Sequence, residues 1–203
     1  MKIRHSALLF LVAATALGDD GGMTRTERSY LLSQLESSKA AVLASIHGLS
    51  QAQWTFKPVP EAWSVQECAE HIILAEEFMF ADEQKILAMP ATSRLANATG
   101  DGDRQIVAQM EDRGSKAQAP PPIMPAGKFP TPESAAREFT LRRDKTIAYV
   151  KATKDALRAH SGTGPTGSTA DAYQVLLMLA SHSERHTAQI REVEANAGYP
   201  KTN

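Results

Sequence analysis

Four long stretches of the chain repeat apolar residues every three or four positions, which is the period of a helix buried along one face. No window shows the alternation of valine, isoleucine and aromatic residues that strands require. Helices with one apolar face must pack those faces together, so the pattern predicts an all-α four-helix bundle. The chain has 203 residues, of which 42% are hydrophobic and 22% charged, which is enough for one domain with a substantial core.

The first two helices have clear start and stop signals. The first is expected from Thr24, which opens a capping box, to about Gly48. The second begins at Ser64, whose side chain can cap the helix together with Glu67 three residues later, and it ends before Pro90. These two helices form the N-terminal half of the predicted bundle.

The last two helices are separated by a short polar link. The third starts at Thr131, which is followed by proline at the first helical position, and it is expected to reach about His160. Residues 161–169 read as a tight polar connection, and the fourth helix runs from near Ser168 to Asn196. The predicted globular domain therefore spans residues 24–200.

The second and third helices are joined by a long segment, from about Pro90 to Pro132, that is rich in proline, glycine and polar residues. A short helix is expected around Arg104 to Arg113. Connections of this length are uncommon in a compact domain unless they are functional or cross over a bundle. The segment is therefore either a crossover or lid, or a loosely ordered surface loop.

The first 18 residues have the pattern of a signal peptide. Lys2 and Arg4 precede an apolar run that is too short for a permanent membrane anchor, and cleavage is expected near Ala16. The mature protein is thus expected to be exported, to the periplasm or the medium, without a stable membrane anchor.

Charge and cysteine content limit the choice of partner. The chain carries 22 basic and 23 acidic side chains, a balance that gives no sign of binding to nucleic acid or anionic lipid and favours a small-molecule partner. Cys68 is the only cysteine, which excludes an intramolecular disulfide, and its place on an apolar helical stripe predicts a buried side chain.

Two histidines, His182 and His186, lie one turn apart on one face of the last helix, close enough to bind one ion. On its own, this spacing favours two hydrogen-bonded interior histidines. His71 adds a third imidazole beside the apolar stripe of the second helix, and three buried neutral imidazoles are costly unless they are hydrogen-bonded or coordinated. Three is also the ligand count of an open metal site, so convergence of these histidines would indicate one. His47 and His160 are interpreted as helix C-terminal residues without a chemical role.

Two polar residues lie on the same helical rows as these histidines. Glu67 comes four residues before His71, and Gln189 three residues after His186, so each could orient an imidazole ring from behind. Glu67 could instead serve only as the capping-box residue, and Gln189 could make a purely structural hydrogen bond.

Three aromatic residues come just before or at the start of the second helix: Trp54, Phe56 and Trp63. They could form the wall of a pocket near the end of the bundle. The alternative, which aromatic residues favour in general, is that they close the apolar core.

Two segments, "FKPVPEAWSVQECAEHIILAEE" and "DAYQVLLMLASHSERHTAQIREVEANAGYP", resemble the DinB-like superfamily, which includes YfiT-like proteins. The resemblance extends to "EFTLRRDKTIAYV" and the proline-rich crossover, and so covers about residues 24–200. It implies an up-down-down-up bundle and a divalent metal, commonly nickel or zinc, with manganese or iron as alternatives. The implied ligands are His71, His182 and His186.

The same resemblance implies an activity on a small molecule. Members of the superfamily include metal-dependent transferases and isomerases that use low-molecular-weight thiols, and many others are described as metal-dependent hydrolases. Export disfavours the thiol chemistry, because such thiols are kept reduced in the cytoplasm. We therefore expect a metal-dependent hydrolase, with a thiol S-transferase or a non-catalytic metal- or ligand-binding bundle as alternatives. A homodimer would be compatible with such a bundle.

Overall fold

The computed structural model describes residues 22–115 and 118–201, so the predicted signal peptide lies outside the described residues. The long helices are α1 (Arg25–Ile46), α3 (Val65–Leu87), α5 (Pro132–Ala152) and α6 (Ala172–Glu194). The shorter elements are α2 (Gln51–Trp54), α4 (Gly100–Glu111), the 3-10 helix η1 (Pro121–Ile123), β1 (Ser161–Thr163) and β2 (Thr169–Asp171). The protein is mostly helical, as the apolar periodicity predicts.

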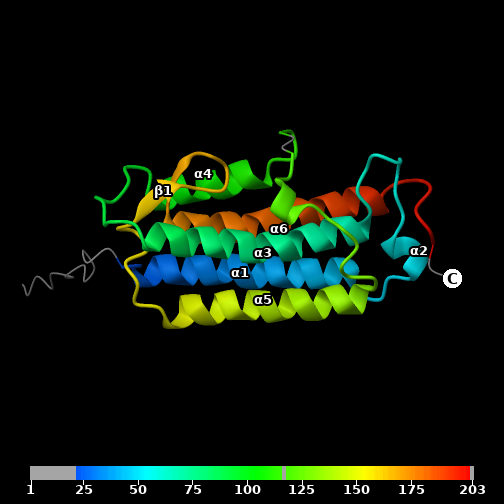
Figure 1. The fold of residues 1–203 in the computed structure, drawn as a ribbon, viewed down its shortest axis with the longest axis horizontal. Coiled ribbons are helices and arrows are strands. Elements are labelled where there is room, and N and C mark those ends of the chain that lie inside the picture. Colours follow the sequence, from blue (N-terminus) through cyan, green and yellow to red (C-terminus); the bar gives the residue numbers. More distant parts are fainter. Residues whose placement is uncertain (1–21, 116–117, 202–203) are drawn as a thin grey trace, which may run out of the picture.

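The four long helices lie side by side and form the predicted bundle (Figure 1). Helices α1 and α6 run in one direction, and α3 and α5 run in the other, which gives an up-down-down-up order along the chain. Helix α6 packs against α1 and α3, and α5 packs against the same two helices from the other side. Helices α3 and α6, which carry the three candidate ligands, are therefore direct neighbours.

The starts of three long helices, α1, α3 and α5, agree with the capping signals. Thr24 and Ser64 each accept a hydrogen bond from the backbone N–H of the glutamate three residues later, and each glutamate side chain accepts one from the backbone N–H of its cap. Thr131 caps α5, with Pro132 at the first helical position. These bonds satisfy N–H groups that have no partner within the helix.

Helix α5 is shorter than predicted. It ends at Ala152 instead of continuing to about His160. The hydroxyl group of Thr153 donates to the side chain of Asp155 and accepts from its backbone N–H, and this local turn competes with further helical hydrogen bonds. Leu157 is fully buried, as its spacing suggests, but it lies in the turn that follows the helix.

The link before α6 is also different from the prediction. The segment 161–169, interpreted as a polar connection, lies entirely within a small antiparallel hairpin of β1 and β2. The hairpin turns at Gly167, which has a φ of +80°. Helix α6 therefore begins at Ala172 rather than near Ser168, and Asp171 at the end of β2 caps it. Three-residue strands are too short to show a period in the sequence.

The long crossover follows from the parallel directions of α3 and α5, because the chain must return along a bundle about 32 Å long. Its helix α4 lies along α6 and spans Gly100–Glu111, several residues earlier than predicted (Figure 1). The buried guanidinium of Arg158 bonds to Asp103 of α4 at 3.1 Å and to Asp171 at 3.0 Å. The crossover is thus docked on the bundle.

A second buried ion pair lies inside the bundle. Arg143 of α5 donates to both carboxylate oxygens of Glu76 of α3, at 2.9 and 2.8 Å. The same guanidinium donates to Ser38 of α1 and to Ser183 of α6. The charged side chains are 0% and 2% exposed, so one arginine joins all four long helices away from water.

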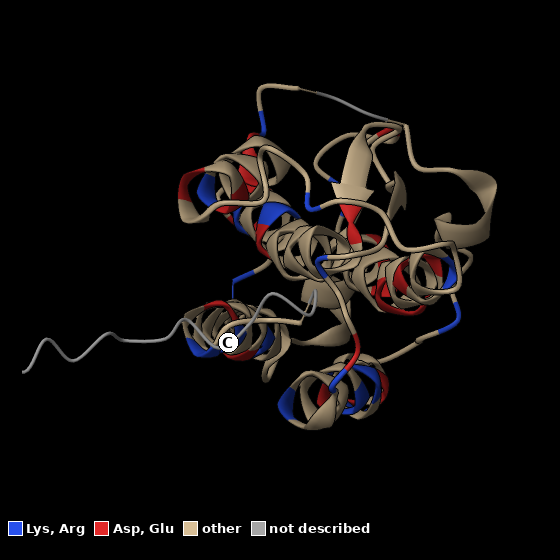
Figure 2. Ribbon diagram, turned by 90° about the vertical axis from the view of Figure 1, so that its left-hand side faces the viewer, with Lys and Arg blue, Asp and Glu red and all other residues tan. Residues whose placement is uncertain are grey.

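Basic and acidic residues are interspersed over the helices (Figure 2). The near balance between basic and acidic residues in the whole chain is therefore also found along the individual helices. Within the described part of the chain, no helix combines the length and apolar character needed to cross a membrane.

Glu83, near the C-terminal end of α3, is fully buried. Burial raises its pKa to about 7, although hydrogen bonds from Gln84 and from the Tyr149 hydroxyl group oppose the rise. Because this pKa is above its ordinary value of 4.5, Glu83 contributes stability below about pH 4.5 that is lost as the pH rises through 7.

We expect Glu83→Gln to raise Tm by a few degrees at pH 8 and to change it little at pH 4, because the variant cannot ionise. Thermal unfolding at both pH values measures this. Glu77→Gln, at a side chain that is 73% exposed on the same helix, is the matched control and should show no such pH dependence. A gain at pH 4 that vanishes at pH 8 would contradict the assignment.

Candidate metal centre

The three candidate ligands lie together inside the bundle. His71 is in the second turn of α3, and His182 and His186 lie one turn apart in α6. One ring nitrogen from each histidine lies within 4.8 Å of the others. Their exposed fractions are 3%, 8% and 8%, so the cluster is almost closed to water. The convergence on which the sequence-based hypothesis depended is therefore present.

The imidazole rings face one another at distances that suit a single ion. Nε2 of His71 is 3.2 Å from Nε2 of His182. The ring centroids of the three pairs are 4.4, 4.5 and 4.9 Å apart. Two imidazole nitrogens bound to one zinc ion, at about 2.0–2.1 Å and a tetrahedral angle, lie about 3.3 Å from each other.

Hydrogen bonds behind two of the rings fix which nitrogen faces the cluster. Nδ1 of His71 lies 2.8 Å from the backbone carbonyl oxygen of Ile123, which can only accept, so this nitrogen carries the proton. Nδ1 of His186 donates in the same way to Oε1 of Gln189 at 2.8 Å. Nε2 of both rings therefore keeps a lone pair for a cation, and partners of this kind orient metal-binding histidines.

The structure assigns Glu67 to the cap of α3 and corrects the suggestion that it orients His71. One carboxylate oxygen accepts from the backbone N–H of Ser64, and the other accepts from Nζ of Lys57, each at 2.8 Å. The ring nitrogens of His71 are bonded to Ile123 and His182 instead.

Sequence reasoning assigned no role to Ile123. It bonds His71 through its backbone carbonyl, which any residue at this position would also provide. The contact also depends on the path of the crossover, which brings residues 52 positions apart together. No side-chain pattern could have revealed it.

The cluster surroundings keep the imidazoles neutral. Burial lowers the pKa of all three histidines below the ordinary value of 6.5, and it brings that of His186 to about 3. Repulsion between neighbouring imidazoles lowers the pKa values of His182 and His186 further. Neutral imidazole is the form that binds a metal, so the ligands remain available at neutral pH.

Trp63 is the aromatic residue that lies beside the cluster. Its ring centroid is 4.9 Å from that of His71 and 6.0 Å from that of His186. Trp54 is fully buried in the apolar core at this end of the bundle, and Phe56 and Trp63, both partly buried, pack against that core. Core closure thus fits all three aromatic residues, and Trp63 in addition contacts the rings of two candidate ligands.

The other histidines and Cys68 have structural surroundings. His47 is exposed at the C-cap of α1. His160 lies in the turn before β1, beyond the end of α5, and its Nδ1 is bonded to the carbonyl oxygen of Met89. Cys68 is fully buried in the apolar core, and burial raises the pKa of its thiol.

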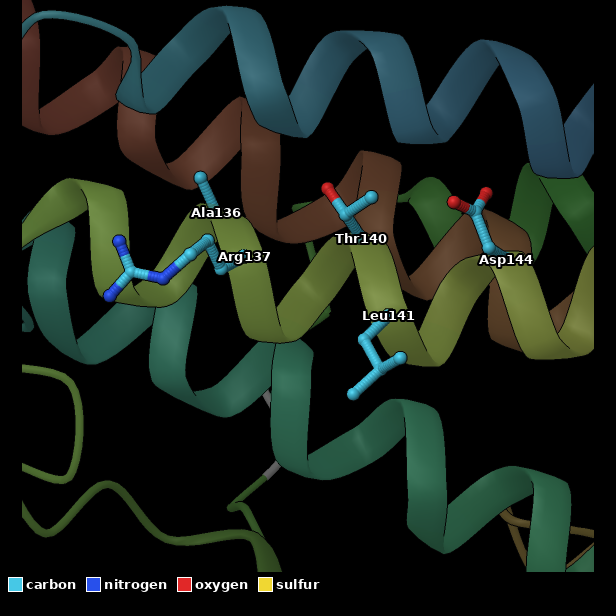
Figure 3. Close-up of a pocket in the computed structure, with 5 residues that line it drawn as sticks. All are labelled: Ala136, Arg137, Thr140, Leu141 and Asp144. Carbon is cyan, nitrogen blue, oxygen red and sulfur yellow. The ribbon is translucent and has the colours of Figure 1, made fainter.

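A surface hollow on the outer face of α5 is the strongest competing location (Figure 3). It is lined by Ala136, Arg137, Thr140, Leu141 and Asp144. All five side chains come from one helix, and none is a histidine or cysteine. The hollow therefore offers no converging donor set comparable to the histidine cluster.

Fold and cluster together define a four-helix bundle protein with three histidines facing one another. A sequence profile of the DinB superfamily matches residues 34–190, which is more than half of the chain and includes all three histidines. The chain therefore belongs to the DinB superfamily, and the family resemblance of its histidine-bearing helices is confirmed.

Two proteins from Bacillus subtilis are similar to this chain. The uncharacterized protein YuaE (strain 168) is 23% identical over 154 residues, which cover 73% of this chain and 88% of YuaE. The structure of YfiT matches with a TM-score of 0.57 at 14% identity, over 88% of this chain and 91% of YfiT. YfiT is described as a probable metal-dependent hydrolase with an unusual four-helix bundle topology. At 14% identity, the similarity to YfiT shows that the two proteins share a fold, and nothing further.

Proposed function

We propose that this protein is a metal-dependent hydrolase of a small molecule, with His71, His182 and His186 as the metal ligands. The convergence of three buried, neutral imidazoles carries this proposal. Membership of the DinB superfamily and the description of YfiT as a probable metal-dependent hydrolase support it.

The donor set fits zinc and nickel, the two ions that the family resemblance implies. Imidazole nitrogen suits zinc, nickel, iron and copper, whereas magnesium and calcium prefer oxygen ligands. All three members of the candidate donor set are histidines. On the family resemblance we propose zinc or nickel as the resident ion, with manganese and iron as the alternatives that metal analysis must compare.

The residues around the cluster have distinct tasks in this proposal. Ile123 and Gln189 hold His71 and His186 in the tautomer that presents Nε2. The ring of Trp63 covers one side of the cluster and limits access of water there. When bound, a divalent cation with three protein ligands supplies Lewis acidity for hydrolysis.

The location of the protein bears on the choice of reaction. We propose that it acts outside the cytoplasm, because its first 18 residues have the pattern of a signal peptide. Such a location favours hydrolysis over thiol S-transfer, since low-molecular-weight thiols are kept reduced in the cytoplasm. A bundle that binds a metal or small ligand without turnover is the remaining alternative.

Metal removal and reloading test the proposed activity. Protein purified without a polyhistidine tag should hydrolyse at least one member of a panel of small esters and amides when loaded with zinc or nickel. Treatment with a chelator should abolish this turnover, and the same ion should restore it. The panel is run with and without glutathione-type thiols, to separate hydrolysis from thiol transfer.

Two histidine variants make this test specific. His186→Ala should lose at least about 100-fold of the metal-dependent rate, because it removes a ligand. His47→Ala makes the same change at an exposed site and should keep the wild-type rate. Metal binding without turnover on any substrate would favour the non-catalytic alternative, and turnover only with added thiol would favour the transferase.

A further inference from the structure

One segment of the crossover, residues 120–130, passes over the N-terminal part of α3, and we refer to it as the strap. It is held at two places. The backbone carbonyl oxygen of Phe129 accepts from Nε1 of Trp54 at 3.3 Å and from the side-chain amide of Gln66 at 3.0 Å. The second anchor is Glu70, which directly precedes His71 in α3.

Glu70 is 0% exposed, and all three of its hydrogen bonds come from backbone N–H groups of the strap. One carboxylate oxygen accepts from Ala126 at 2.9 Å. The other accepts from Gly127 at 2.8 Å and from Lys128 at 3.1 Å. A buried carboxylate is costly unless its oxygens are bonded, so Glu70 and the strap hold each other in place.

Gly127 allows the strap to present three successive N–H groups to one carboxylate. Its φ is +79°, in the left-handed region that side chains with a Cβ rarely adopt. A Cβ atom at this position would meet no heavy atom within 4 Å. The requirement for glycine is therefore conformational and not steric, which provides a mild way to disturb the strap.

The strap reaches the histidine cluster through Ile123, three residues before Ala126. Its side chain is 5% exposed, and its carbonyl oxygen accepts from Nδ1 of His71 at 2.8 Å. Consecutive residues of α3 thus contact the strap at two points: Glu70 holds the segment that follows Ile123, and His71 is oriented by Ile123 itself.

We propose that Glu70 is a positioning residue for the metal site: it holds the strap so that Ile123 fixes the tautomer and orientation of His71. The proposal rests on the proposed function, since it gives Glu70 a role in metal binding by His71. Glu70 itself is not one of the three residues that could hold the ion. Its effect passes from Ala126, which donates to Glu70, along the strap to Ile123, whose carbonyl oxygen accepts from Nδ1 of His71.

Glu70→Gln tests this role with little change in size. An amide has one acceptor oxygen, and its NH₂ group would face a backbone N–H, so at least one of the three bonds is lost. Glu67→Gln is the matched control, since it removes a carboxylate one turn earlier on α3, and glutamine can still complete the capping box. Gly127→Ala disturbs the strap while leaving Glu70 intact.

The first readout needs no metal. Nitrogen-15 chemical shifts of the His71 ring in metal-free protein should show the Nδ1–H tautomer in the wild type and in Glu67→Gln, and a mixture of tautomers in Glu70→Gln. The second readout is zinc affinity, measured by competition with a chelating dye. It should fall about 10-fold in Glu70→Gln, within the range for partners that orient metal ligands. Gly127→Ala should show a smaller loss in the same direction.

A wild-type tautomer and wild-type zinc affinity in Glu70→Gln would overturn the proposal while leaving the three-histidine site intact. Equal losses in Glu70→Gln and Glu67→Gln would also overturn it, because the effect would then belong to α3 as a whole. If wild-type protein binds no zinc, nickel, manganese or iron, the proposed function fails. The tautomer readout still decides whether Glu70 positions His71. If Glu70→Gln does not fold, Gly127→Ala decides the question by the same two readouts.

Discussion

Replacing His182 with alanine should reduce the bound metal from about one ion per chain to a trace. His182 provides the Nε2 that lies 3.2 Å from Nε2 of His71, and its removal leaves only two of the three donors. Affinity should fall by more than about 100-fold, because even partners behind the ligands contribute about 10- to 100-fold. Elemental analysis of tag-free protein, dialysed after loading with zinc or nickel, measures the loss.

His47→Ala is the matched control for this experiment. His47 is exposed at the end of α1, so the variant should retain the metal content of the wild type. Equal metal in the wild type and in His182→Ala would show that the cluster is not the binding site. Loss of metal from both variants would point to a nonspecific effect of removing histidine.

The second large effect concerns stability. Arg143→Ala should lower the free energy of unfolding by about 3–5 kcal/mol, the range found when one partner of a buried ion pair is removed. The substitution leaves the carboxylate of Glu76 buried without its bidentate partner and removes the bonds from Arg143 to Ser38 and Ser183. Urea unfolding followed by circular dichroism measures the change.

Arg142→Ala provides the comparison, because Arg142 is the adjacent residue and its ion pairs with Glu77 and Glu138 are partly exposed. It should cost no more than about 1 kcal/mol. A double variant, Arg143→Met with Glu76→Leu, should recover most of the loss, since an apolar pair leaves no buried charge. If Arg143→Ala costs no more than Arg142→Ala, removal of Arg143 does not leave the Glu76 carboxylate as a costly unpaired charge.

Local signals predicted much of this fold. Capping residues such as Thr24 and Ser64 marked helix starts correctly, because the bonds involved span three residues. The end of α5 was predicted too late, since the apolar spacing continues to Leu157 although the backbone turns at Thr153. Docking of α4 through Arg158 depends on groups 55 residues apart, and a local pattern does not contain that information.

The candidate site was predictable to a similar degree. The spacing of His182 and His186 placed two imidazoles on one face, and the position of His71 beside the apolar stripe of another helix made it the third candidate, in agreement with the resemblance to the superfamily. Helical spacing also placed Gln189 on the same row as His186, and its side chain accepts a hydrogen bond from that ring. Glu67 shows what the sequence could not decide. Its position allowed two roles, and in the structure its carboxylate is bonded to the cap residue Ser64 and not to His71.

The most direct test of a single three-histidine metal site is a crystal structure of tag-free, zinc-loaded protein, with anomalous differences recorded at the zinc edge. We expect one strong peak per chain, about 2.0–2.1 Å from a ring nitrogen of each of His71, His182 and His186. A peak elsewhere on the chain, or one coordinated by fewer than three of these histidines, would contradict it.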